Sequence, residues 1–208
     1  MQRYILTGTP GAGKTAILRQ LERLGQVVVD EAATDVIALD QARGIAEPWR
    51  DPGFIDRIVA LQRQRQILAA DLPSPVQFFD RSPVCTYALA TFLGHPPSET
   101  LLAELARIER ERTYQPDVFF IDNLGFCTPT EARRISFEDS LRFERVHEER
   151  YRTLGYRCIR IAPGSVARRA ERILRAVPRL SANAMGVSGL SDDFDEPLPQ
   201  SELDGFSA

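Results

Sequence analysis

One stretch near the start of the chain, Gly8-x-x-x-x-Gly13-Lys14-Thr15, combines glycines, a lysine and a hydroxyl at a spacing suited to phosphate chemistry. Glycines at 8, 11 and 13 tolerate positive φ, so the loop can turn its backbone N–H groups inward on an anion. Lys14 would set a compact positive charge beside the β- and γ-phosphates, and the Thr15 hydroxyl suits Mg²⁺. Lys14 is also the only lysine of a chain that otherwise uses arginine. We therefore expect ATP to be bound by Gly8, Pro10, Gly11, Ala12, Gly13, Lys14, Thr15 and Ala16.

Acidic residues and an arginine follow two later apolar runs, as Asp30-Glu31 and Asp80-Arg81. Asp80 can hold Mg²⁺ together with Thr15, directly or through water. Arg81 can stabilise charge on a phosphoryl group during transfer, or grip an acceptor. Either Glu31 or Asp30 could accept or orient the proton of an attacking hydroxyl. The alternatives are structural, because an acid after a strand can cap a helix and an arginine can form a surface ion pair.

A third feature is the Arg133-Arg134 pair, which lies in a segment of mixed polarity from 123 to 137. Phosphoryl transfer needs charge stabilisation and exclusion of water, and a mobile loop that carries arginine supplies both. We therefore consider Arg133 and Arg134 as catalytic candidates on a lid. A solvated loop with two surface arginines is the alternative reading.

Four residues between 49 and 65 could line a pocket for the acceptor, although core or surface positions are the alternative for each. They are Trp49, Phe54, Gln62 and Arg65. Residues 62–66 form the predicted polar face of a long helix, and the run 107–112 is predicted to be a solvated helix face.

The elements that must position these residues alternate along the chain. Apolar runs and turn signals predict strands at 3–7, 27–29, 76–80, 117–122 and 156–161. Helical spacing of apolar residues predicts helices at 16–24, 33–42, 54–71, 84–93, 98–112, 138–154 and 166–177. This alternation favours an α/β fold of three layers, with a five-stranded parallel sheet and helices on both faces. Working sites of such sheets lie at the carboxyl ends of the strands.

Length and composition set further limits. The 208 residues suit one domain, which we assign to 1–180, followed by a flexible acidic tail at 181–208. The tail has six acids and no base, whereas the whole chain has a net charge of −3, so the rest is mildly basic. That balance suits phosphate handling and argues against nucleic acid as the main partner. Three cysteines without a CxxC pair and the absence of a long apolar run or leader favour a cytoplasmic protein that does not enter a membrane.

Taken together, these residues resemble the small P-loop ATPase/kinase family with AAA_28-type domains, which includes bacterial nicotinamide-riboside kinases. The sequence is also similar, more remotely, to deoxynucleoside kinases. The resemblance covers about residues 3 to 177. It rests on Ile-Leu-Thr-Gly-Thr-Pro-Gly-Ala-Gly-Lys-Thr, then Val-Val-Val-Asp-Glu-Ala-Ala, then Phe-Phe-Asp-Arg-Ser-Pro and Leu-Gly-Tyr-Arg-Cys-Ile-Arg-Ile-Ala-Pro.

The resemblance implies the strand order 2-3-1-4-5. It also implies that Glu31 is the strand-two carboxylate that serves as base or as ligand of the acceptor hydroxyl. Asp80-Arg81-Ser82 matches the acid-Arg-Ser segment of those kinases, here with aspartate in place of glutamate. Either Arg133 or Arg134 would be the lid arginine. The sequence shows no arginine-finger segment or second domain of the ring-forming AAA motors, which argues against a hexameric machine.

The sequence thus predicts an ATP- and Mg²⁺-dependent phosphotransferase that moves the γ-phosphoryl group to a hydroxyl of a small, nucleoside-like molecule. One alternative is an NTPase or nucleotide-dependent switch that signals to a protein partner, in which Glu31 would position water. Another is a module that binds nucleotide without turnover, but a complete set of Lys14, Thr15 and Asp80 argues against it.

Overall fold

The computed structural model describes residues 1–125 and 136–178. Residues Met1–Val177 form one compact unit. The candidate lid arginines Arg133 and Arg134 and the predicted tail, 181–208, lie outside the described residues.

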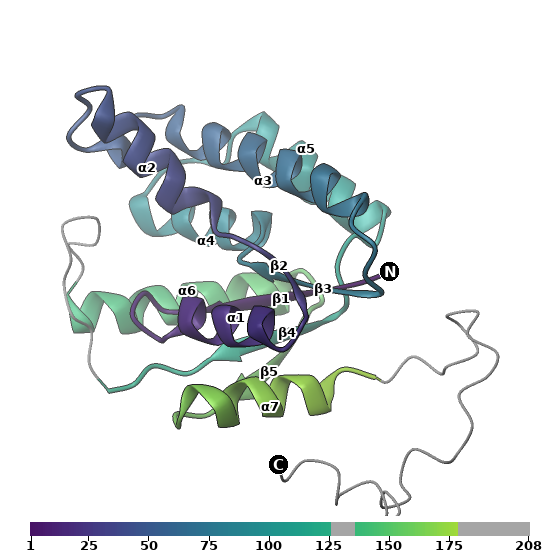
Figure 1. The fold of residues 1–208 in the computed structure, drawn as a ribbon. Coiled ribbons are helices and arrows are strands. Elements are labelled where there is room, and N and C mark those ends of the chain that lie inside the picture. Colours follow the sequence, from purple (N-terminus) through teal and green to yellow (C-terminus); the bar gives the residue numbers. More distant parts are fainter. Residues whose placement is uncertain (126–135, 179–208) are drawn as a thin grey trace, which may run out of the picture. The chain divides into compact units, whose positions relative to one another are not determined.

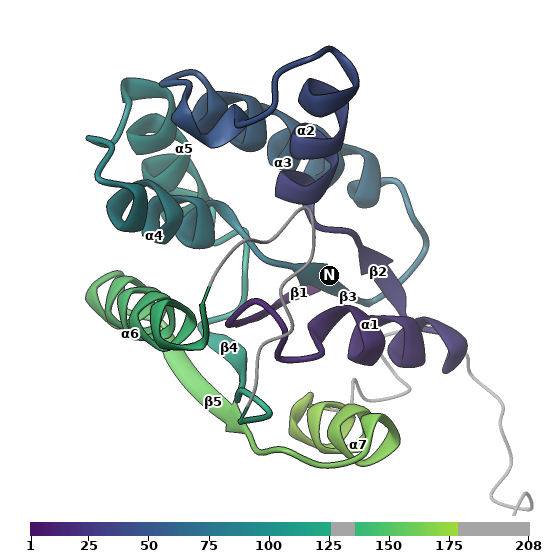
Figure 2. The same cartoon turned by 90° about the vertical axis from the view of Figure 1, so that its left-hand side faces the viewer.

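Five parallel strands form one sheet in the order β2-β3-β1-β4-β5, as predicted. The register pairs Leu6 with Asp80 and Gly8 with Ile121, so the carboxyl ends of β3, β1 and β4 lie side by side. Figure 2 views the sheet from this end, where the loop that leads into α1 lies. The strands are β1 (Gln2–Gly8), β2 (Val27–Val29), β3 (Val76–Asp80), β4 (Asp117–Ile121) and β5 (Arg157–Ile161).

Helices cover both faces of the sheet, which gives the predicted three layers (Figure 1). On one face lie α1 (Lys14–Arg23) and α7 (Val166–Ala176). On the other face lie α2 (Ala32–Ala42), α3 (Phe54–Ala70), α4 (Pro83–Leu93), α5 (Glu99–Arg110) and α6 (Phe137–Thr153). One 3₁₀ turn, η1 (Pro48–Arg50), lies between α2 and α3.

Alternate residues of each strand feed two separate cores. Tyr4 and Leu6 of β1 are buried against α1 and α7, whereas Ile5 is buried among the helices of the opposite face. Phe78 and Phe79 of β3 divide between the two faces in the same way. Successive side chains of a strand point to opposite faces, so a strand covered on both sides reads as a continuous apolar run.

Helix α3 departs from the expected solvent-facing polar stripe over 62–66. Gln62 and Gln66 are buried, whereas Arg63 and Gln64 are exposed. Residues four apart share a helix face, so one side of the stripe points inward and brings two amides into the interior.

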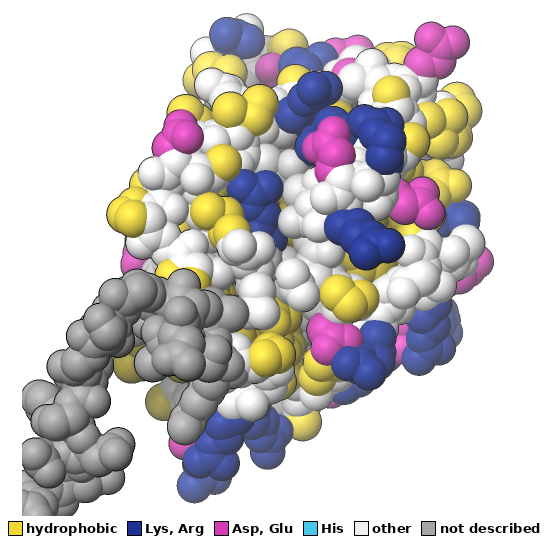
Figure 3. All heavy atoms as spheres, turned by 90° about the vertical axis from the view of Figure 1, so that its right-hand side faces the viewer, with side chains coloured by type: hydrophobic (Ala, Val, Ile, Leu, Met, Phe, Trp, Pro, Cys, Tyr) yellow, Lys and Arg dark blue, Asp and Glu magenta, His cyan; other side chains and the backbone are white. Residues whose placement is uncertain are grey.

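No helix in residues 1–125 and 136–178 is both long enough and apolar enough to cross a membrane. On the face drawn in Figure 3, arginines lie scattered among acidic side chains. Cys85 and Cys158 are free thiols, and Cys127 lies outside the described residues.

Candidate functional site

The loop between β1 and α1 has the backbone that its glycines predict. Gly8, Gly11 and Gly13 have φ of 131°, 83° and 83°, in the region that L side chains rarely adopt. A Cβ at Gly8 would lie only 2.3 Å from the carbonyl oxygen of Ile121 on β4. Glycine is therefore required at Gly8 by close approach of a neighbouring strand as well as by φ.

Lys14 begins α1 and folds back over the loop. Its Nζ donates to the backbone oxygens of Gly8 (3.1 Å) and Thr9 (2.8 Å), and the residue is 6% exposed. Thr15 is exposed in the same first helical turn. The arrangement places an ammonium, a hydroxyl and the N-terminus of a helix at one concave loop, which is the chemistry that phosphates need.

Arg169, on α7, braces this loop from behind, and the sequence reasoning missed it. Its two terminal nitrogens donate to the backbone oxygens of Ala12 (2.8 Å) and Asp122 (3.0 Å), and the side chain is 3% exposed. Burial lowers the pKa of Arg169 from its ordinary value. The signal was present, because Arg169 shares the buried stripe of α7 with Ile173, four residues further on.

Glu31 and Arg81 meet at the ends of β2 and β3. The Arg81 Nε lies 2.5 Å from the Glu31 Oε1, and the Thr34 hydroxyl donates to Glu31 Oε2 at 2.8 Å. Although burial lowers it, the net shift of the Arg81 pKa is upward, because the charge of Glu31 favours the charged guanidinium. Asp30, the alternative to Glu31, is exposed and pairs with Arg19 at 3.1 Å.

Arg81 also has an unusual backbone. Its φ of 72° is in the left-handed region, which only one other non-glycine among the described residues, Arg112, adopts. The Arg81 N–H donates to the Leu6 oxygen at 3.0 Å, which continues the pairing of β3 with β1. Asp80, the last residue of β3, is buried beside Leu6. A left-handed non-glycine residue costs on the order of 1 kcal/mol and is typical of functional sites.

Behind Arg81 lies His147 of α6, another residue that the sequence reasoning did not identify. The Arg81 Nη1 is 3.1 Å from the His147 Nε2. The signal was weak, because a histidine within a helix of mixed polarity has no distinguishing neighbours in sequence.

A cavity of about 460 Å³ opens beside these groups. Glu31, Arg81 and Pro10 of the phosphate loop all line it, so the loop and the ends of β2 and β3 share one space. Most of the remaining walls are apolar or aromatic, and the rings of Phe92 and Phe143 pack at a tilt with centroids 4.6 Å apart. A cavity of this size, lined by apolar and aromatic side chains together with several polar and charged ones, is typical of a small-molecule site.

Three of the four acceptor-pocket candidates line this cavity. They are Trp49, Phe54 and Gln62. Gln62 Oε1 accepts a hydrogen bond from the hydroxyl of Thr86, another lining residue, at 3.0 Å. Arg65 does not line the cavity. It donates to the backbone oxygen of Asp30 (2.9 Å) and pairs with Asp35.

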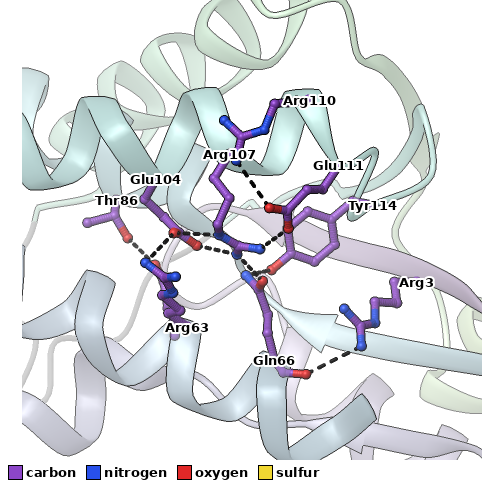
Figure 4. Close-up of polar contacts among 10 residues, drawn as sticks. Arg3, Arg63, Gln66, Thr86, Glu104, Arg107, Arg110, Glu111 and Tyr114 are labelled. Carbon is purple, nitrogen blue, oxygen red and sulfur yellow. Dashed lines mark hydrogen bonds and ion pairs between the residues drawn. The ribbon is translucent and has the colours of Figure 1, made fainter.

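The helix that carries Gln62, α3, is tied to α5 by a polar cluster further along both helices (Figure 4). Arg107 donates to Glu104 at 2.6 Å and to Gln66 Oε1 at 2.6 Å, and the Gln66 amide donates to the Tyr114 hydroxyl at 2.6 Å. Residues 109–112 are exposed, as predicted for a solvated face, whereas Arg107 is largely covered and pairs with the buried Glu104. Arg107 bridges α5 to α3 and fixes the helix on which Gln62 stands.

Residues 1–125 and 136–178 contain no group of three or more His, Cys, Asp or Glu side chains that could hold a metal ion. Mg²⁺ that arrives with nucleotide phosphates needs only one or two protein oxygens, and Thr15 and Asp80 are of the right chemistry.

Two solved structures share the fold of this chain. Deoxyadenosine kinase from M. mycoides, with dCMP and dCDP bound, has a TM-score of 0.55 and 14% identity over 84% of this chain and 97% of that chain. NadR protein in complex with NR has a TM-score of 0.62 and 14% identity over 86% of this chain. The chain spans 53% of that NadR chain. At this identity the likeness is one of fold.

A match of sequence to a family is more specific. No curated protein matches this chain. Residues 3–169, however, match the AAA domain family AAA_28 over the phosphate loop, the ends of β2 and β3, and the start of α7. The chain therefore belongs to the AAA_28 family of AAA domains, and its fold is like that of the deoxyadenosine kinase and NadR structures.

Proposed function

We propose that this protein is an ATP-dependent phosphotransferase that moves the γ-phosphoryl group to a hydroxyl of a small, nucleoside-like molecule. The observation that carries the proposal is the shared space beside the phosphate loop. Pro10 of that loop lines the same cavity as Glu31 and Arg81. An acceptor seated there would present its hydroxyl between a carboxylate, a guanidinium and the phosphates.

The phosphate loop would hold the triphosphate. Its backbone N–H groups and the N-terminus of α1 favour anions, and Lys14 would exchange its contacts with the Gly8 and Thr9 oxygens for the β- and γ-phosphates. Thr15 and Asp80 would hold Mg²⁺, which neutralises charge on the transferring and leaving groups.

Glu31 would act on the acceptor. The attacking oxygen forms a bond to the γ-phosphorus while the bond to the oxygen that bridges the β- and γ-phosphates breaks. The hydroxyl proton passes to the Glu31 carboxylate, and ADP leaves. Arg81 would stabilise the charge of the phosphoryl group in flight, and Arg133 or Arg134 would add a second positive charge from the lid.

The lining of the cavity favours an acceptor with a flat ring. Trp49 and the Phe92–Phe143 pair offer aromatic surfaces, and Gln62 and Thr86 offer polar groups for the ring edge. Two solved structures of similar fold support this choice. One is a deoxyadenosine kinase with dCMP and dCDP bound, and the other is NadR in complex with NR.

The test is formation of ADP from MgATP, with and without a panel of nucleosides and small hydroxyl compounds. A compound that accelerates ADP formation and gains the phosphate would support the proposal. Lys14→Ala and Glu31→Gln should abolish the reaction. Asp30→Asn is the matched control for Glu31→Gln, because Asp30 pairs with Arg19 at the surface and should retain activity. ADP and free phosphate released at equal rates whatever is added would favour an NTPase or switch instead.

A further inference from the structure

His147 makes two contacts that together define its chemical state. The ring is 0% exposed on α6. Its Nδ1 lies 2.9 Å from the backbone oxygen of Phe143, and its Nε2 lies 3.1 Å from Nη1 of Arg81. A carbonyl oxygen can only accept a hydrogen bond and a guanidinium can only donate one. Nδ1 therefore carries the ring proton, and Nε2 is an unprotonated acceptor.

The surroundings keep the ring neutral as well. Burial, and then the positive charge of Arg81, lower the pKa of His147 to about 3. Lys14 acts in the same direction, whereas Glu31 and the bond to Phe143 oppose it. A charged ring would also turn Nε2 into a donor facing another donor, which the contact with Arg81 does not allow.

We propose that His147 is a positioning residue that holds the Arg81 guanidinium toward the cavity as a neutral hydrogen-bond acceptor. The inference rests on the proposed phosphotransfer at this site. Glu31 also holds Arg81, but in that reaction Glu31 takes up the acceptor's proton and loses the charge that attracts the guanidinium. His147 takes no part in the proton transfer, so its contact with Arg81 persists through the step.

A neutral acceptor suits this task better than a second carboxylate. A carboxylate at position 147 would hold Arg81 more strongly, but it would also offset the positive charge that the phosphoryl group needs. An imidazole fixed by its own backbone bond supplies direction without adding charge. The strained backbone of Arg81, with φ of 72°, is consistent with a side chain whose aim is tightly set.

Helix α6 is built to deliver this contact. Phe143, His147 and Tyr151 recur at intervals of four and face the site together. Phe143 forms a wall of the cavity, and the Tyr151 hydroxyl lies 2.7 Å from that of Ser82, the residue after Arg81. The helix thus holds both Arg81 and its neighbour from one side.

The first test compares His147→Leu with His147→Gln, whose amide oxygen can take the place of Nε2. His147→Leu should lower kcat by about 10- to 100-fold with KM values changed by less than about threefold, because the guanidinium is misplaced in the transition state. His147→Gln should recover most of kcat. Equal losses in both variants, or a loss confined to KM, would overturn the proposal.

A double-mutant cycle separates positioning from packing. If His147 acts through Arg81, then Arg81→Ala and Arg81→Ala/His147→Leu should have the same kcat within about twofold. A further loss of 10-fold or more in the double variant would contradict the proposal. Ser140→Ala, another buried α6 residue outside the cavity lining, controls for disturbance of the helix and should retain kcat.

The protonation state of His147 can be measured without any enzymatic reaction, so this test does not depend on the proposed function. The chain has two histidines, so the ring nitrogens of the ¹⁵N-labelled protein can be assigned with His95→Gln. His147 should appear as the neutral Nδ1–H form at pH 7, even if no acceptor is ever found. A charged ring, or the Nε2–H form, would overturn the holding role whatever the activity.

Discussion

Replacing Gly8 with alanine should lower the stability of the fold far more than the same change at an ordinary left-handed glycine, because β4 passes directly behind Gly8. The added Cβ would lie 2.3 Å from the Ile121 oxygen, with φ at 131°. Backbone strain contributes about 1–3 kcal/mol and overpacking about 1–3 kcal/mol more, so we expect a loss of about 4 kcal/mol in the free energy of unfolding. For a chain of this size that is a fall in Tm of roughly 8–16 °C.

Gly155→Ala is the matched control. Gly155 has φ of 79°, and a Cβ there would meet nothing within 4 Å. Strain of the left-handed backbone is then the only expected effect. It should lower the free energy of unfolding of Gly155→Ala by about 1–2 kcal/mol, or roughly 2–8 °C in Tm. The difference between the two variants isolates the close approach of β1 and β4.

The assay is thermal unfolding followed by circular dichroism, with and without MgATP. Wild type and Gly155→Ala should both gain Tm with nucleotide, whereas Gly8→Ala should lose this gain because its loop is displaced. If Gly8→Ala loses no more Tm than Gly155→Ala, the contact with Ile121 does not shape the phosphate loop.

Three further predictions follow from buried charged and polar groups. The pKa of His147 is about 3 in the folded chain and 6.5 in the reference state, so protons favour the unfolded chain below about pH 6.5. Between about pH 8 and 5 the free energy of unfolding, measured in urea, should therefore fall by about 2 kcal/mol. The same measurement on His147→Gln should show a fall that is smaller by that amount. Parallel curves of stability against pH for the two proteins would refute this prediction. Glu104→Gln should lower the free energy of unfolding by about 1–3 kcal/mol, because it weakens the buried contact with Arg107. Glu104 does not line the cavity, so kcat should be retained. An unchanged urea midpoint would contradict this prediction. Arg169→Gln should weaken nucleotide binding by about tenfold in a calorimetric titration, since the phosphate loop loses its brace; unaltered affinity would show that the loop is held without it.

The fold could be predicted because its signals are local. The phosphate loop carries its own sequence pattern, and each strand reads as an apolar run bounded by turn residues. The alternation of strands and helices then leaves a parallel sheet as the main solution, and the strand order followed from the resemblance to kinases. These features depend on neighbours within a few residues along the chain.

The ends of β2 and β3 were predictable for a related reason. Parallel strands end at one edge of a sheet, so residues distant in sequence were expected to meet there, and Glu31 and Arg81 do. The residues alone left the choice between Asp30 and Glu31 open, and the resemblance to kinases favoured Glu31. The structure directs Glu31 into the cavity and leaves Asp30 at the surface.

The residues that sequence reasoning missed act across long separations. His147 and Arg169 lie on α6 and α7, and their partners Arg81 and Ala12 come 66 and 157 residues earlier. Such contacts depend on the rotation of each helix about its axis. The mixed polarity of α6 does not reveal that rotation for His147, whereas Arg169 lies four residues before Ile173 on one face of α7. Gln62 was a pocket candidate, and it does line the cavity, but the polar face on which the sequence also placed it is buried at Gln62 and Gln66.

The most direct measurement of the central claim follows the γ-phosphate itself. ATP labelled at that position would be incubated with the full chain, Mg²⁺ and the acceptor panel, and label would be counted separately in organic product and in free phosphate. The account predicts that one nucleoside-like compound takes most of the label and that Glu31→Gln abolishes the transfer. Label that appears only as free phosphate, at a rate no compound changes, would contradict it.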